Sequence, residues 1–259
     1  MPFLEIGDFR GHYSFSERPG APVLVLSNSL GTNYSMWDPQ IPEFEKHLGV
    51  LRYDTRGHGQ SSVTPGPYRI EQLGRDVLHL LDRLNLDRVH FCGLSMGGMI
   101  GMWLGVNAPE RLGKLVLCNT AARIGNAETW NARIDAVSKG GMKSVAPAII
   151  ERWFTPAFRA AARESVALAQ RMIEASPPDG YSACCAAIRD MDQRDNISSI
   201  RVPTLVISGT KDPVTTSADG QFLVDRISHA RHLELPTAHL SNIEAPNQFS
   251  SQVIGFLAA

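Results

Sequence analysis

The sequence lacks three features: an apolar run of membrane-spanning length, a charge imbalance and abundant cysteine. A spanning helix needs roughly 20 apolar residues in a row, and no run approaches that length. Lys and Arg total 25 against 26 Asp and Glu, a formal net charge of -1. We therefore expect neither nucleic acid nor a membrane as a partner. The opening Met-Pro-Phe-Leu-Glu-Ile-Gly-Asp has acids where a secretory signal needs basic residues, so we expect a cytoplasmic protein.

The 4 cysteines do not form a metal-binding or disulfide pattern. Cys92 and Cys118 lie inside apolar runs, where cysteine behaves as a small core side chain. Cys184 and Cys185 are adjacent, which prevents an ordinary bridge between them. No C-x-x-C motif occurs. We expect no disulfide framework and no metal site.

Short apolar runs alternate with helical patterns along much of the chain. The runs cover residues 23–26, 89–92, 115–118 and 205–207. Such runs are typical of strands buried on both faces, and the residues between many of them have helical periodicity, as in 70–84. This alternation predicts an α/β fold with a mostly parallel central sheet flanked by helices. Residues 3–6 and 12–15 are expected to form an antiparallel edge.

The alternation stops between residues 121 and 196, where the pattern is helical without a convincing strand. Strand character returns at Val202-Pro-Thr-Leu-Val-Ile-Ser. We interpret residues 121–196 as a helical cap over the strand ends, inserted into a core formed by residues 1–120 and 197–259.

A serine between two glycines follows one of the predicted strands. Gly93-Leu94-Ser95-Met96-Gly97 matches G-x-S-x-G, with an apolar strand before it and a helical pattern after it. In this strand–turn–helix context the serine has a strained backbone, flanking glycines avoid Cβ clashes, and the hydroxyl projects above the sheet. We predict that Ser95 is a nucleophile; the alternative is a glycine-bounded turn that merely tolerates serine.

A serine nucleophile needs a base, and the base needs an orienting acid. In this fold class the chain order is Ser, then Asp or Glu, then His. Asp212 lies in the turn after the strand that ends near Gly209, and His239 follows the last predicted strand. His58 precedes Ser95 and is therefore in the wrong order. We predict Ser95, His239 and Asp212 as the catalytic residues.

Two backbone N–H groups are candidates to stabilise the oxyanion. The Met96 N–H begins the helix after Ser95, where the helix dipole favours negative charge. The second donor is expected from the loop after the strand at 23–26, and we place it at the Leu30 N–H.

Together these residues resemble the α/β-hydrolase family over nearly the whole chain. Asp54-Thr-Arg-Gly-His-Gly-Gln-Ser matches the family's D-x-R-G-x-G-x-S loop. Two departures are small: Asn28-Ser29-Leu30-Gly31 replaces the common His-Gly-x-Gly, and Ala238 stands where glycine commonly precedes the histidine. Both leave the backbone donors available.

A narrower resemblance is to the 3-oxoadipate enol-lactonases of bacterial aromatic catabolism. It rests on Ser27-Asn-Ser-Leu-Gly-Thr with Trp37-Asp-Pro-Gln, on Gly93-Leu-Ser-Met-Gly-Gly-Met and on Arg152-Trp-Phe. The resemblance implies hydrolysis of the lactone to 3-oxoadipate through an acyl-enzyme in the β-ketoadipate pathway. It also implies a small carboxylate-bearing lactone as substrate and no cofactor.

The buried carboxylate of such a substrate would need a cationic partner. Trp130, Arg133, Ile134 and Val137 share one face of a predicted cap helix, so Arg133 is a cation on an apolar stripe. We predict that Arg133 binds the substrate carboxylate and that Trp130 walls the pocket, with Trp153 as a further pocket residue. The alternative for Arg133 is a stem that covers apolar surface and a head that reaches water.

Other functions remain open from the sequence. A carboxylesterase, a carbon–carbon bond hydrolase or a perhydrolase would use the same three residues, because substrate choice resides in the cap. A haloalkane dehalogenase needs an acid at the nucleophile position, which Ser95 does not supply. A ligand receptor of the same fold is the alternative outside catalysis.

Overall fold

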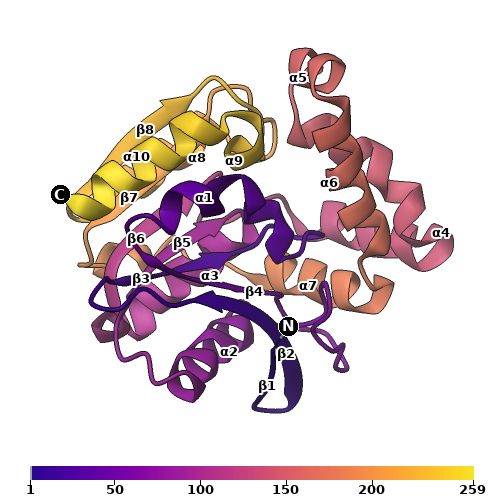
Figure 1. Cartoon of the computed structure of the whole chain (residues 1–259). Coiled ribbons are helices and arrows are strands. Elements are labelled where there is room, and N and C mark those ends of the chain that lie inside the picture. Colours follow the sequence, from indigo (N-terminus) through magenta and orange to yellow (C-terminus); the bar gives the residue numbers. More distant parts are fainter. Residues whose placement is uncertain (1) are drawn as a thin grey trace.

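The computed structural model describes residues 2–259, and its centre is one eight-stranded sheet (Figure 1). The strand order is β1-β2-β4-β3-β5-β6-β7-β8. The strands are β1 (Phe3–Ile6), β2 (Phe9–Ser16), β3 (Val23–Ser27), β4 (Gly49–Tyr53), β5 (Val89–Leu94), β6 (Leu112–Cys118), β7 (Thr204–Gly209) and β8 (Ala230–Leu235). β2 pairs antiparallel with β1 and β4, and every other pairing is parallel. The predicted sheet and its antiparallel edge are confirmed.

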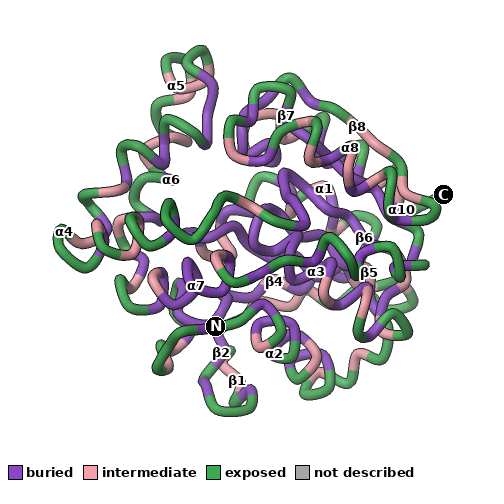
Figure 2. The backbone as a smooth tube through the Cα atoms, turned by 180° about the vertical axis from the view of Figure 1, so that it is seen from behind, coloured by how far each residue is buried: buried purple, intermediate pink, exposed green. Residues whose placement is uncertain are grey.

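Helices of the core cover both sides of this sheet. They are α1 (Ile41–Phe44), α2 (Ile70–Arg83), α3 (Met96–Asn107), α8 (Ser217–Arg226), α9 (Ser241–Glu244) and α10 (Pro246–Ala258), with 3₁₀ turns at Tyr34–Gln40, Pro109–Arg111 and Ile197–Ser199. Figure 1 shows α1 and α10 on one side of the sheet and α2 on the other. Because both faces are covered, Leu24, Val25 and Leu26 of β3 are fully buried. Figure 2 shows that buried segments gather at the centre of the molecule and that exposed segments lie on the outer helices and loops.

Four helices fill the stretch between β6 and β7. They are α4 (Ala127–Trp153), α5 (Pro156–Ala161), α6 (Arg163–Ala175) and α7 (Pro178–Asp190). α4 is two helical arms, because the backbone leaves the helical region at Gly141 (φ 67°, ψ -177°). We keep the predicted boundaries, residues 121–196, as our definition of the cap. Figure 1 shows α4, α5 and α6 standing beside the core, with α7 against it.

The sheet topology gathers several loops at one edge. β3, β5, β6, β7 and β8 are mutually parallel neighbours, so the loops that follow them emerge at the same edge of the sheet. In open α/β sheets this edge is where ligands bind. The cap begins after β6 and therefore starts at this edge. Within residues 2–259, no helix is both long and apolar enough to span a bilayer.

Candidate active site

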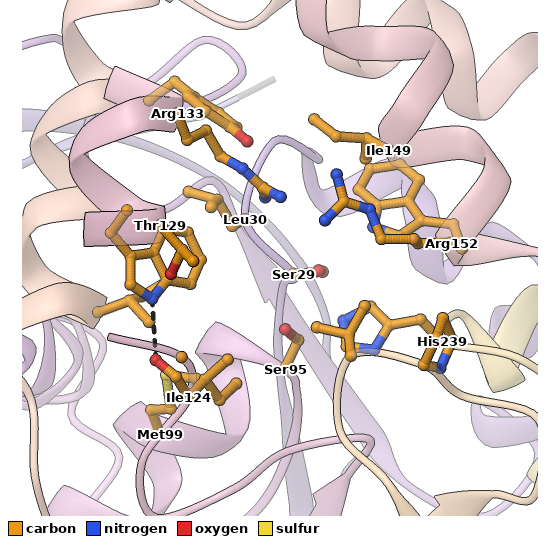
Figure 3. Close-up of a pocket in the computed structure, with 17 residues that line it drawn as sticks. Ser29, Leu30, Ser95, Met99, Ile124, Thr129, Arg133, Ile149, Arg152 and His239 are labelled. Carbon is orange, nitrogen blue, oxygen red and sulfur yellow. Dashed lines mark hydrogen bonds between the residues drawn. The ribbon is translucent and has the colours of Figure 1, made fainter. Parts of the chain in front are cut away.

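Ser95 occupies the sharp turn between β5 and α3, with φ 56° and ψ -113°. Positive φ is uncommon outside glycine and marks a strained residue held by its surroundings. Two contacts hold it: the Ser95 N–H donates to the Cys118 carbonyl at 2.9 Å, and the Thr120 hydroxyl donates to the Ser95 carbonyl at 2.8 Å. The fixed backbone leaves the side chain facing the cavity at the strand ends (Figure 3).

The glycines that flank Ser95 are required by close backbone approach. A Cβ atom at Gly93 would lie 2.1 Å from the Gly97 carbonyl oxygen, and one at Gly97 would lie 2.2 Å from the Ser27 carbonyl oxygen. Neither contact is possible for a real side chain, so the predicted reason for the two glycines is confirmed.

Asp212 and His239 lie in the loops after β7 and β8 and are hydrogen-bonded to each other. The distance from His239 Nδ1 to Asp212 Oδ2 is 2.8 Å, and both side chains are buried. An ionised carboxylate only accepts, so the proton lies on Nδ1 and Nε2 is left as the basic nitrogen. Ser95 and His239 line the same cavity (Figure 3). The structure thus brings the three predicted side chains to one edge of the sheet.

The Asp212 carboxylate is surrounded by donors. Oδ1 accepts from the Val214 and Thr215 N–H groups at 2.8 and 3.1 Å. Oδ2 accepts from the Thr215 hydroxyl at 2.7 Å and from Asn119 Nδ2 at 3.0 Å, besides His239. Burial alone would raise the pKa of Asp212, but the charge and hydrogen bond of His239, with the bonds from Asn119 and Val214, lower this pKa to about 2.

Asn119 belongs to the site but was not predicted from the sequence. It follows β6, and its Nδ2 bridges Asp212 and the Ala238 carbonyl while its Oδ1 accepts from Ser241. Its only sequence signal is a polar residue directly after a buried strand. Asn119 therefore ties the carboxylate to the loop that carries His239.

The two predicted oxyanion donors lie on segments that are bonded together. Met96 is the first residue of α3, and Leu30 lines the cavity from the loop after β3. The Gly97 N–H donates to the Asn28 carbonyl at 3.0 Å, which holds this loop against the start of α3. The role of the Met96 and Leu30 N–H groups stays a prediction.

Core and cap enclose a cavity of about 260 Å³ above Ser95. The core contributes Ser29, Leu30, Ser95, Met99, Pro213, Val214 and His239, and the cap contributes residues that include Thr129, Trp130, Arg133, Ile149, Arg152 and Trp153. A largely apolar lining with a few convergent polar groups is typical of small-molecule sites.

All three predicted cap residues line this cavity. The Trp130 Nε1–H donates to the Ile124 carbonyl at 2.9 Å, which fixes its ring. The Arg133 guanidinium lies 5.2 Å from the centre of that ring, a cation–π arrangement that directs it. Trp153 is buried at the end of α4.

Arg152, from the Arg152-Trp-Phe motif, is a second cavity arginine, and its sequence context did not predict a role for it. It projects from the second arm of α4, opposite Arg133 on the first arm (Figure 3). Partial burial of its guanidinium, then the nearby charge of Arg133, lower the pKa of Arg152. Within residues 2–259, neither arginine has an acidic partner within ion-pair distance. The cavity therefore offers two unpaired cations.

Metal chemistry has no candidate ligand set in the part of the chain that the structure describes. No group of three or more His, Cys, Asp or Glu side chains is arranged to hold a metal ion there. The four cysteines are buried and unbridged.

Known proteins match this chain along nearly its whole length. Residues 22–140 match the model of the alpha/beta hydrolase fold family. The chain is 45% identical to 3-oxoadipate enol-lactonase 2 of Acinetobacter baylyi, over 96% of this chain and 94% of that protein. It is 40% identical to 3-oxoadipate enol-lactonase 1 of the same organism, over 92% and 89%.

A solved structure shares the fold in detail. The crystal structure of the enol-lactonase from Burkholderia xenovorans superposes with a TM-score of 0.98 at 43% identity, over 100% of both chains. With this fold and this similarity over nearly the full length, the chain belongs to the α/β-hydrolase fold family.

Proposed function

We propose that this protein is a serine hydrolase that opens 3-oxoadipate enol-lactone to 3-oxoadipate, in the β-ketoadipate pathway. The observation that carries the proposal is one cavity lined by Ser95, His239 and two arginines that have no acidic partner in the described part of the chain. A hydrolytic centre beside an anion site suits an ester that also carries a carboxylate. The names of the two Acinetobacter relatives supply the particular lactone.

In the first half-reaction, His239 Nε2 takes the proton of the Ser95 hydroxyl while Oγ attacks the lactone carbonyl carbon. The Met96 and Leu30 N–H groups stabilise the negative oxygen of the tetrahedral intermediate. The ring C–O bond then breaks, and His239 returns the proton to the departing enol oxygen. The enol tautomerises to a ketone, and Ser95 carries the acyl group.

In the second half-reaction, water gives a proton to His239 and attacks the acyl carbon. The Ser95–acyl bond breaks, Ser95 recovers its proton, and 3-oxoadipate leaves with a second carboxylate. Asp212 holds the imidazole with Nε2 toward Ser95 and stabilises the imidazolium that forms in both halves. These steps consume one water and need neither a metal nor a redox cofactor.

The free carboxylate of the lactone pairs with Arg133, and Arg152 stands opposite as a second donor. A planar guanidinium suits a carboxylate because it offers parallel N–H groups. Trp130 orients Arg133, and Trp153 closes the apolar wall beside the ring of the substrate. The charge of Arg133 disfavours the charged form of Arg152, so a carboxylate bound between the two would relieve their repulsion.

The decisive experiment offers purified protein 3-oxoadipate enol-lactone, with Ser95→Ala as the test variant and Ser208→Ala as the control. Ser208 is a buried serine outside the cavity, bonded to His232. We expect rapid loss of the lactone with the parent and Ser208→Ala, and a loss of activity of roughly 10⁴-fold or more in Ser95→Ala.

Simple nitrophenyl esters, ring-cleavage dienes and peroxide with a carboxylic acid test the other hydrolases of this fold. Faster turnover of any of these than of the enol-lactone would replace the proposed substrate. Saturable binding of the lactone with no turnover by the parent protein would instead indicate a receptor.

A further inference from the structure

His58 is a buried histidine outside the proposed catalytic set. It lies in the loop after β4 and has no exposed surface. One side of its ring meets the loop that carries Leu30, and the other meets the cap helix α7. His58 therefore sits between the oxyanion loop and the cap.

The turn at residues 29–32 carries the predicted oxyanion donor Leu30. The Thr32 N–H donates to the Ser29 carbonyl at 3.2 Å, which closes the turn. Gly31 has φ 79°, the conformation that the third residue of a type II turn requires. The Gly31 N–H points out of the turn and donates to His58 Nε2 at 2.9 Å.

This hydrogen bond fixes the protonation state of the ring. A backbone N–H can only donate, so His58 Nε2 must be the unprotonated nitrogen. His58 Nδ1, at 3.4 Å from the Arg56 carbonyl, carries the proton of the neutral ring. On the opposite side of the turn, the Ser176 hydroxyl of the cap donates to the Gly31 carbonyl at 3.2 Å.

We propose that His58 is a positioning residue: its neutral imidazole holds the Gly31 peptide, and through it the Leu30 N–H, in the orientation that receives the oxyanion. The proposal rests on the proposed function of Ser95. Gly31 is confined on its remaining side, since a Cβ there would lie 3.0 Å from Ile173 and 3.1 Å from Tyr181. Without the His58 acceptor, the Gly31 N–H would be buried without a partner. The Leu30–Gly31 peptide would then rotate toward another acceptor, which would displace the Leu30 N–H.

The surroundings of His58 keep it neutral. Burial lowers the pKa of His58 to about 4, against the opposing effects of the Arg56 carbonyl and the Asp54 charge. The Arg56 guanidinium is paired with Asp76 and Asp8. From α7, the ring faces Cys184 Sγ at 3.9 Å and the Tyr181 ring at 6.4 Å; burial raises the pKa of both these groups, so they stay uncharged.

The test compares glutamine and asparagine at position 58, whose side-chain amides place a hydrogen-bond acceptor at different distances from the backbone. The side-chain end of His58→Gln reaches the position of Nε2, whereas that of His58→Asn reaches only the position of Nδ1. We expect His58→Asn to lower kcat about 30-fold with KM within twofold, because a displaced oxyanion donor costs transition-state binding. His58→Gln should recover most of this loss. His12→Gln, at another fully buried histidine, controls for lost stability and should keep the parent kcat.

The measurements are kcat and KM for the enol-lactone and for p-nitrophenyl acetate, the rate of Ser95 labelling by a fluorophosphonate, and the melting temperature. The labelling rate needs no assumption about substrate, so it tests His58 even if the enol-lactone is not turned over. Equal kcat and labelling rates in folded His58→Gln, His58→Asn and parent would overturn the proposal. Should His58→Asn fail to fold, a His58→Gln variant with 30-fold reduced labelling at an unchanged melting temperature would overturn it as well.

Discussion

The strand-end loops and the cap hold their polar groups in opposite ways. In the loops, Asp212 receives hydrogen bonds from two backbone N–H groups and three side chains, and the strained Ser95 backbone is bonded on both sides. In the cap, Arg133 and Arg152 project from two arms of a helix broken at Gly141, and neither has an acidic partner among residues 2–259.

In the proposed function, this contrast divides two tasks: the strand-end loops carry out catalysis, and the cap recognises the substrate. Ser95, Asp212 and His239 lie on loops that follow strands of the sheet, and the paired strands restrict the positions of these loops. The two arginines that we propose to bind the ligand lie on helices joined to the core through loops, and they have no carboxylate partner among residues 2–259. Arg133 is half-buried and Arg152 is exposed, so both guanidinium groups are accessible for pairing with an anionic ligand. In the proposed function, the core supplies the hydrolytic groups and the cap supplies the groups that select the substrate.

The largest effect should follow from changing the carboxylate on the core side. Asp212→Asn keeps the volume but offers His239 an amide that can stabilise the wrong tautomer, so we expect kcat to fall about 10³–10⁴-fold for every ester. Steady-state kinetics on the enol-lactone and on p-nitrophenyl acetate measure this. Asp219→Asn, in the first turn of α8, is the control. A loss confined to the lactone would contradict the separation of chemistry from selection.

Mild acid should lower the stability of the protein through His58 in the core. The pKa of His58 is about 4 in the folded protein, against about 6.5 when unfolded. Between these values the unfolded chain binds the extra proton, so the free energy of unfolding falls as pH falls, by about 3 kcal/mol in total. Urea unfolding at pH 7 to 4.5 measures the slope.

His58→Gln serves as the comparison in this experiment, since glutamine does not titrate. We expect a shallower decline for the variant over the same pH range. Asp212 affects the free energy of unfolding at lower pH than His58 does. Its pKa of about 2 means that its stabilisation is complete above about pH 4 and is lost below that pH. Parallel curves for parent and variant between pH 6.5 and 4.5 would refute the assignment to His58.

How much the sequence revealed also differs between the two regions. Ser95, Asp212 and His239 were predictable because each follows a short apolar strand, and parallel strands place their following loops at one edge. Asn119 and Thr215 were not, since their side chains reach Asp212 only through the meeting of loops that periodicity does not describe.

In the cap, one helical face was enough to identify Trp130 and Arg133 as cavity residues, because they lie on the first arm of α4. Arg152 lies beyond the break at Gly141, and a single 3.6-residue period cannot relate side chains across such a break. The adjacent Gly140 and Gly141 are the sequence signal that one helix becomes two arms.

Changing the cap cations should affect recognition and leave the chemistry intact. We expect Arg133→Met to raise KM for the enol-lactone about 10–100-fold, a loss of about 1.5–3 kcal/mol for a charge-assisted hydrogen bond. The kcat/KM for the neutral p-nitrophenyl acetate should stay within threefold. Arg163→Met, on the exposed surface of α6, controls for charge. An unchanged KM for the lactone would remove Arg133 from recognition, and the same measurement on Arg152→Met assigns the second arginine.

The smallest effect should come from the contact that joins the two regions. The Glu244 carboxylate accepts from the Ala238 N–H at 2.9 Å, beside His239, and from the Thr155 N–H and hydroxyl at the end of the cap segment that carries Arg152. Glu244→Gln turns an acceptor into a donor that faces these N–H groups, so we expect about 1–2 kcal/mol lower stability and a kcat only a few-fold lower.

The loss in Glu244→Gln should be equal for the enol-lactone and p-nitrophenyl acetate, because His239 serves both substrates and the cap recognises only one. Urea unfolding and steady-state kinetics measure the two effects, with Glu164→Gln on exposed α6 as the control. A loss several times larger for the lactone would mean that the contact transmits carboxylate binding from the Arg152 segment to His239. Glu244 would then couple substrate recognition in the cap to catalysis at His239. The structural difference between the two regions would in that case not correspond to a division of function.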